Sequence, residues 1–171
     1  MHLDNVTIDE ARTFLSTRTP EERKFYEIDA DREVRTSRFI AGVRSNGVVV
    51  GVAGVAVAYH LFPHTYYMVR KENWGNGVGI QLQQKLTGYI QSHKVPFILQ
   101  TVYIDNVAAN KLHDRLGTKV IYKGSDNYHR FRAFTSMGKL VAPFLPLIIW
   151  VYYSPIGKAV IKLRDIPKLR M

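Results

Sequence analysis

Three glycines at alternate positions, Gly75, Gly77 and Gly79, constrain this chain more than any other local feature. An apolar run that ends at Val69 precedes them, and a helical pattern of apolar residues begins at Val78. The segment therefore predicts a strand, a glycine-rich turn and a helix in succession. Because glycine has no β-carbon, a ligand can approach this backbone closely. The N–H groups of a first helical turn attract anions, so we expect a phosphate-bearing cofactor here.

The spacing of the glycines separates this turn from two common phosphate-binding motifs. A dinucleotide fingerprint requires a further glycine where Ile80 stands, and a P-loop requires a Gly-Lys-Ser/Thr sequence that is absent. Taken alone, the segment also fits a turn that only connects a strand to a helix. A second segment is therefore needed to choose between these interpretations.

Two segments together resemble the signatures of the GNAT superfamily of N-acetyltransferases. Residues 69–79, Val-Arg-Lys-Glu-Asn-Trp-Gly-Asn-Gly-Val-Gly, are similar to its acetyl-CoA turn, although Trp74 stands where Arg or Gln is usual. The second signature follows an apolar run at 97–103 and consists of Asn106, Ala109, Leu112 and Gly117. The resemblance covers residues 38–134. It implies a mixed, mostly antiparallel α/β sheet flanked by helices, with acetyl-CoA as acyl donor and an amine as acceptor.

The resemblance also implies which residues contact the cofactor and which carry the chemistry. The usual general acid of the family is a tyrosine, and its position falls on His113, whose side chain titrates near neutral pH. A polar helix residue without a catalytic role is the alternative at this position. His64, Tyr66, Tyr67 and Glu72 flank the strand where a base or a water relay would lie. The candidate cofactor-binding residues are Met68, Val69, Arg70, Trp74, Gly75, Asn76, Gly77, Val78, Gly79, Ile80 and Asn106.

The rest of the chain predicts elements of one α/β domain. Capping boxes at Thr7 and Thr19 predict two short helices in the first 35 residues, with Phe25 and Ile28 on the buried face of the second. Ser45-Asn46-Gly47 predicts a type I′ hairpin between strands at 39–43 and 48–59, which Leu61-Phe62-Pro63 ends. A strand at 65–70, helices from 78 and over 106–116, and strands at 97–103, 119–123 and 128–134 complete the prediction.

Composition limits the chemistry and the compartment. The chain has no cysteine, which excludes disulfides, thiolate metal sites and a cysteine nucleophile. His60 and His64 on one turn, without a nearby Asp or Cys, do not predict a metal site. The first residues contain neither a basic region nor an apolar run, so we expect no signal peptide and a cytoplasmic protein.

Charge is distributed unevenly along the chain. Residues 1–36 contain nine Asp and Glu against six Lys and Arg, whereas the remainder contains five against 18. So basic a body attracts anions, and nucleic acid or an acidic membrane surface is a candidate partner. The alternative is that the charge only keeps the surface soluble.

The C-terminal extension, residues 136–171, lies outside the resemblance and follows an acyltransferase domain at 1–135. It contains 18 uncharged residues from Leu140 to Gly157 and then a basic stretch, Lys158 to Arg170. Pro143 and Pro146 interrupt a regular helix, and the length is at the lower limit for spanning a bilayer. We interpret it as an arm that packs on the domain or forms a homodimer contact, with a membrane-surface segment as the alternative.

These observations predict an acyl-CoA-dependent N-acyltransferase. The basic body favours an amine acceptor carried on nucleic acid. Small amines, protein lysines and N-termini remain as other acceptors. A non-catalytic CoA-binding or interaction module is the alternative, because Trp74 and His113 depart from two usual positions.

Overall fold

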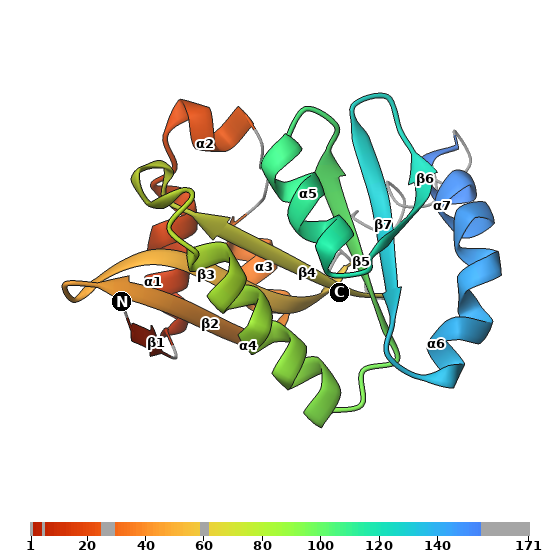
Figure 1. Ribbon diagram of the computed structural model, residues 1–171, viewed down its shortest axis with the longest axis horizontal. Coiled ribbons are helices and arrows are strands. Elements are labelled where there is room, and N and C mark those ends of the chain that lie inside the picture. The colour runs from red at the N-terminus through yellow and green to blue at the C-terminus, as the bar shows by residue number, and fades with distance from the viewer. Residues whose placement is uncertain (1, 5, 25–29, 59–61, 155–171) are drawn as a thin grey trace, which may run out of the picture.

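The computed structural model describes residues 2–4, 6–24, 30–58 and 62–154. Within these ranges, seven strands form one sheet in the order β1-β2-β3-β4-β5-β7-β6 (Figure 1). All neighbouring strands are antiparallel except β4 and β5, which are parallel. The mixed, mostly antiparallel sheet predicted from the sequence is thereby confirmed. The strands are β1 (His2–Asp4), β2 (Ser37–Ser45), β3 (Val48–Ala58), β4 (Phe62–Val69), β5 (Phe97–Tyr103), β6 (Lys119–Lys123) and β7 (Asn127–Ala133).

Helices cover both faces of this sheet (Figure 1). Phe14 and Leu15 of α1 and Val34 of α3 pack on one face, and the fully buried Leu82, Leu86 and Ile90 of α4 pack on the other. The helices are α1 (Ile8–Ser16), α2 (Pro20–Lys24), α3 (Ala30–Thr36), α4 (Val78–Ser92), α5 (Val107–Arg115), α6 (Ser136–Val141) and α7 (Leu145–Tyr153). Two single 3-10 turns, Lys71–Asn73 and Ala142–Phe144, join them to their neighbours.

Local sequence signals explain the first half of the fold. Thr7 and Glu10 form the expected capping box at α1, and Thr19 and Glu22 form the same pair of hydrogen bonds before α2. Asn46 and Gly47 both have positive φ, as a type I′ hairpin requires, and set the β2–β3 register. These short-range signals fix where the chain turns before any long-range contact forms.

Two local predictions differ from the structure. The first 36 residues contain a third helix, α3, whose sequence is mostly charged. Val34 is the buried apolar side chain among those described at 33–36, and the sequence shows no apolar period that would predict this helix. Phe62 and Pro63 lie inside β4 rather than ending the hairpin, because proline is tolerated near the start of a strand. Phe25, Ile28, His60 and Leu61 lie outside the described residues.

The C-terminal extension forms α6 and α7 beside β7 and β6 (Figure 1). Leu145 of α7 is fully buried against Phe97 and Phe131. Pro143 lies in the 3-10 turn between the two helices, and Pro146 lies in the first turn of α7, where proline is tolerated. Among the described residues, no helix combines the length and apolar character needed to cross a membrane. The basic stretch from Lys158 onwards lies outside the described residues.

Candidate active site

The two parallel strands in the middle of the sheet separate towards their carboxyl ends (Figure 1). Within the described residues, the register between β4 and β5 consists of the pair His64–Leu99. One step further along, Gln100 Nε2 donates a hydrogen bond of 2.7 Å to Thr65 Oγ1. Beyond that bond, no backbone pairing joins the strands up to their ends. The crevice outside the carboxyl ends of parallel strands is where α/β sheets bind ligands.

The glycine-rich turn lies at the end of β4 and presents bare N–H groups. Gly75 and Gly77 have φ values of 81° and 77°, in the left-handed region that glycine adopts without strain. Gly77 is the N-terminal cap of α4 and provides no capping side chain. Within the turn at 75–79, which the structure describes in full, the N–H groups of Gly75, Gly77, Val78 and Gly79 have no acceptor. Together with the helix dipole, these donors suit a phosphate.

The space around the glycines also fits a ligand. A β-carbon added to Gly75 or Gly77 would meet no atom within 4 Å. A β-carbon on Gly79 would point at Leu112 of α5, 3.9 Å away, so this glycine faces the gap between α4 and α5. The backbone is therefore accessible on the side where its N–H groups are unpaired. These features fit a cofactor that carries phosphates, such as acetyl-CoA.

Arg70, which the sequence predicts as a cofactor contact, makes its hydrogen bonds within the protein. Its backbone N–H donates to Val50 O, and its guanidinium bonds to Phe14 O, Thr17 Oγ1 and Glu22 Oε2 at 2.7–3.1 Å. The guanidinium also lies over the Phe14 ring. Both the backbone N–H and the guanidinium of Arg70 are thus bound within the protein.

The remaining predicted cofactor residues divide into structural and accessible groups. The Trp74 indole N–H donates a hydrogen bond of 2.8 Å to Val69 O, so this side chain links the turn to the end of β4. Asn106 caps α5, because its Oδ1 accepts a hydrogen bond from the N–H of Ala109. Met68 is buried in the core below α1. Asn76 and Ile80 are exposed beside the glycines.

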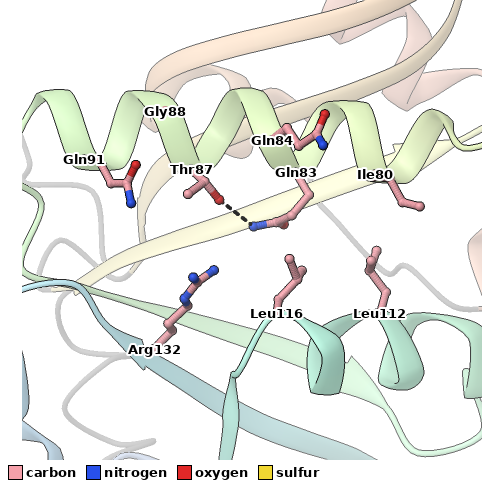
Figure 2. Close-up of a pocket in the computed structure, with 9 residues that line it drawn as sticks. All are labelled: Ile80, Gln83, Gln84, Thr87, Gly88, Gln91, Leu112, Leu116 and Arg132. Atoms are coloured by element: carbon pink, nitrogen blue, oxygen red, sulfur yellow. Dashed lines mark hydrogen bonds between the residues drawn. The ribbon is translucent and has the colours of Figure 1, made fainter.

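A cavity of about 370 Å³ separates α4 from α5 (Figure 2). Its rim at the glycine end is formed by Ile80 and Leu112, and Arg132 of β7 points into its far end. Gln83 lines the cavity, is buried, and its Oε1 has no hydrogen-bond partner in the described structure. The full lining consists of Ile80, Gln83, Gln84, Thr87, Gly88, Gln91, Leu112, Leu116 and Arg132.

Tyr67 and His113 meet on the α4–α5 face of the sheet. The Tyr67 hydroxyl lies 2.5 Å from His113 Nε2, across the separation between β4 and α5. Burial lowers the pKa of His113 to about 4, and the nearby Arg130 charge acts in the same direction. Burial also raises the pKa of Tyr67 well above its usual value. At neutral pH the pair therefore holds a neutral imidazole and a protonated phenol.

Arg130 of β7 fixes the position of α5 and hence of His113. Its buried guanidinium bonds to Asp114 Oδ1 at 2.8 Å and to Asn110 Oδ1 at 3.0 Å. His113 O accepts hydrogen bonds from the N–H and the hydroxyl of Thr118. Contacts from Arg130 and from Thr118 therefore fix α5, and with it the position of the His113 imidazole.

A second histidine occupies the opposite face of β4. His64 Nε2 lies 2.8 Å from Glu33 Oε2 of α3, and His64 Nδ1 is buried without a partner in the described structure. Tyr66 points to this same face, where its hydroxyl contacts Ser37 Oγ at 3.0 Å and burial raises its pKa to about 12. Because side chains alternate along a strand, His64 and Tyr67 lie on opposite sides of the sheet.

The predicted catalytic residues therefore do not form one cluster. His113 and Tyr67 lie on the α4–α5 face, and His64 and Tyr66 lie on the α1–α3 face, with the crevice between the strands connecting the two. Glu72 lies apart from both groups: it is exposed on the 3-10 turn Lys71–Asn73. Glu33 and Gln100 were missed by the sequence, because a single carboxylate or amide in a helix or strand carries no local signal. Tyr67 was noted only as one of several residues flanking β4.

The chain and its fold are similar to known acetyltransferases. The family model described as "Acetyltransferase (GNAT) family" matches residues 5–118. No curated protein sequence matches the chain. A GNAT acetyltransferase from Streptococcus pneumoniae has a similar fold, with a TM-score of 0.61 and 17% identity over 78% of this chain and 99% of that chain.

Two structures with bound cofactor are also similar in fold. The putative acetyltransferase yncA from Salmonella typhimurium, solved with its cofactor acetyl-CoA, gives a TM-score of 0.64 and 14% identity over 80% of this chain and 95% of that chain. The paia N-acetyltransferase from Thermoplasma acidophilum, in complex with coenzyme A, gives 0.59 and 11% over 78% and 98%.

Proposed function

This chain belongs to the GNAT acetyltransferase family, and we propose that it is an N-acyltransferase that transfers acetyl from acetyl-CoA to an amine. The observation that supports this most is the unpaired anion cradle where β4 ends, beyond the point at which β4 and β5 stop pairing. A cradle of this kind holds the phosphates of the donor. The bound donor supplies an activated thioester carbonyl at the crevice.

The chain provides a proton donor on one side of the crevice. In the tautomer with its proton on Nε2, His113 donates to the Tyr67 oxygen and leaves the phenol hydrogen free to point at a ligand. Tyr67 then protonates the departing thiolate, the hydrogen bond from His113 Nε2–H stabilises the resulting phenolate, and solvent returns the proton to the phenolate oxygen. This assignment changes the role predicted for His113, because a histidine with a pKa of about 4 is not protonated at neutral pH.

A proton acceptor lies on the other side. Glu33 accepts the Nε2 proton of His64, which leaves the lone pair on Nδ1 as the basic position. His64 takes a proton from the incoming ammonium, directly or through water, and the free amine attacks the carbonyl. Backbone N–H groups near Met68 and Val69 polarise that carbonyl in this proposal.

The charge of residues 1–36, whose helices α1 and α3 lie on the same face of the sheet as His64, favours a cationic amine as the acceptor. Residues 1–36, which include α1 to α3, contain nine acidic against six basic residues. A protonated small amine, lysine side chain or N-terminus complements this face better than a polyanion does. An acceptor carried on nucleic acid is the second candidate, supported by the 18 Lys and Arg against five acids in the remainder. A CoA-binding module without catalysis is the alternative from another functional class.

Gly77 and Gly47 provide a matched test of cofactor binding. Both have positive φ, 77° and 80°, and a β-carbon on either would meet no atom within 4 Å. Gly77→Ala and Gly47→Ala should therefore carry the same backbone cost, about 1 kcal/mol. Only Gly77→Ala should weaken acetyl-CoA binding, by tenfold or more in calorimetry, because only this methyl group lies in the cradle. Equal affinity in both variants would refute the cradle.

Thiol release with a panel of acceptors tests the reaction itself. The panel contains a polyamine, a lysine peptide, a peptide with a free N-terminus and an aminoacyl-RNA. We expect turnover with one of the cationic amines. Turnover only with the RNA acceptor would reverse our preference, and tight acetyl-CoA binding without any turnover would favour the non-catalytic module.

A further inference from the structure

The C-terminal helices carry an unusual concentration of exposed apolar side chains. Of the 13 large hydrophobic residues exposed in the described chain, seven lie within residues 136–154. We call them the α6–α7 face: Met137, Leu140, Phe144, Leu147, Ile148, Trp150 and Val151, each between 39% and 68% exposed. Monomeric soluble proteins rarely expose contiguous apolar surface on this scale, so the face points to a partner.

Among the described side chains of α7, residues 145–151, the buried apolar ones lie on one side of the helix. Leu145 and Ile149, four residues apart, are buried, and the first of them packs on Phe97 and Phe131. The remaining circumference includes Leu147, Ile148 and Trp150, all exposed. A helix that only covers the sheet needs polar residues on its outer side, and α7 has no charged residue at all. The outer side of α7 is therefore built for an apolar environment.

Basic residues surround this face, and acidic ones are absent from it. The sequence contains no Asp or Glu between Asp126 and Asp165. Lys139 on α6 is exposed, as are Lys119 and Lys123 on β6, the strand beside α7. The sequence after α7 adds five Lys and Arg and one Asp from residue 158 to residue 170. The partner must therefore offer an apolar region that can bury these side chains and a negatively charged surface that can meet the basic residues.

We propose that the α6–α7 face docks on the surface of an anionic lipid membrane. Trp150 and Phe144 are side chains that favour the interface between headgroups and acyl chains, and Leu147, Ile148 and Val151 supply apolar area that a bilayer can bury. Lys119, Lys123 and Lys139 meet the anionic headgroups. Docking leaves the α4–α5 face and the glycine turn, which lie away from α7 in Figure 1, open to the cofactor.

Two other occupants fit less well. A symmetric dimer through this face would bring the same basic residues of two copies together, with no acid between Asp126 and Asp165 to offset them. Nucleic acid would attract the lysines but gives no apolar partner to aliphatic side chains such as Leu147 and Val151. Only a lipid surface accounts for both the charge and the aliphatic area.

Vesicle binding by the full-length protein tests the proposal. The probes are vesicles of phosphatidylcholine alone and of phosphatidylcholine with phosphatidylglycerol at about three parts to one. We expect at least tenfold stronger sedimentation with the anionic vesicles, weakened by salt. The double substitution Leu147→Glu with Trp150→Glu should reduce this binding tenfold or more. Both positions are about 60% exposed, so the fold should survive, as circular dichroism would verify.

A matched control comes from the far end of the molecule. Ile8 and Val48 are 56% and 65% exposed on α1 and at the β2–β3 turn, so Ile8→Glu with Val48→Glu adds the same charge elsewhere. This variant should bind vesicles like the wild type. No preference for anionic vesicles, or equal binding by the Leu147/Trp150 variant, would overturn the proposal. A wild-type dimer that the same variant dissociates, without vesicle binding, would assign the face to a second copy.

Discussion

The Tyr67–His113 pair determines where protons lie at the crevice. A phenol whose pKa is raised by burial keeps its proton at neutral pH, and a hydrogen bond from the adjacent neutral imidazole stabilises the phenolate that forms after transfer. Tyr67→Phe should therefore lower kcat by about 10² to 10³ with little change in cofactor affinity. Tyr66→Phe is the matched control, because the neighbouring phenol points to the other face and contacts Ser37. Similar rates for both variants would show that Tyr67 is not the acid.

Stability should depend on pH through the same buried histidine. The pKa of His113 is about 4 in the folded protein and about 6.5 when the chain is unfolded, so the unfolded chain binds the extra proton between these values. The contribution of His113 to the free energy of unfolding is therefore fully present above pH 6.5. As the pH falls towards 4, this contribution is lost, and the free energy of unfolding decreases by up to about 3 kcal/mol. Burial lowers the pKa of His129 too, which adds to the loss in the acidic range.

Urea unfolding at pH 7 and pH 5 measures this effect. We expect His113→Gln to reduce the difference in unfolding free energy between the two pH values. His93→Gln removes an exposed imidazole from the end of α4 and serves as the control. An unchanged pH dependence in His113→Gln would mean that His113 titrates normally in the folded protein.

At the level of elements, Arg70 joins the N-terminal helices to the end of β4. Its partner Glu22 is almost wholly buried. Burial by itself would raise the pKa of the Glu22 carboxyl. The pKa nevertheless lies below its usual value, because Glu22 accepts hydrogen bonds from the N–H groups of Thr19 and Lys71 and lies beside the charge of Arg70. We call the contacts of Arg70 with Phe14, Thr17 and Glu22 the clamp. The glycine turn begins directly after Arg70, so α1 and α2 hold the end of β4 from which the turn extends.

Removing the clamp should be costly because it leaves Glu22 buried without its cation. We expect Arg70→Ala to lower the free energy of unfolding by about 3 kcal/mol. Lys71→Ala is the control, because Lys71 Nζ is exposed and lies 3.8 Å from the exposed Glu21, and solvent screens such a surface pair. Urea titration of both variants decides between a clamp and a surface contact. A loss in Arg70→Ala no larger than in Lys71→Ala would contradict the clamp.

Elements were predictable where their signals are local. Asn46-Gly47 sets a hairpin, and the repeat of Leu82, Leu86 and Ile90 sets the buried side of α4, within a few residues of sequence. The site was less predictable because its contacts are distant. Tyr67 and His113 are 46 positions apart, and Glu33 and His64 are 31 apart. Only the folded sheet brings these groups together, and the crevice then divides them between two faces.

At the scale of the whole molecule, the sheet separates two different surfaces along one axis. Helices α1 and α3 pack on β2 and β3, and the largely apolar helices α6 and α7 lie at the β7–β6 end (Figure 1). The crevice between β4 and β5 lies between these regions. The proposed acceptor site beside α1 and α3 and the proposed lipid-docking α6–α7 face would therefore lie at different ends of the sheet.

The C-terminal helices also complete the core, and this distinguishes two truncations. Gly138 of α6 lies so close to Pro96 O that a β-carbon there would overlap it, and Leu145 covers Phe97 and Phe131. Ending the chain at Thr135 should therefore expose this cluster and lower stability by roughly 3 kcal/mol or more, with aggregation. Ending it at Ser154 keeps every described contact and should preserve the melting temperature while weakening vesicle binding through lost Lys and Arg. Thermal unfolding and light scattering compare the two, and a soluble, equally stable chain ending at Thr135 would show that α6 and α7 are not part of the core.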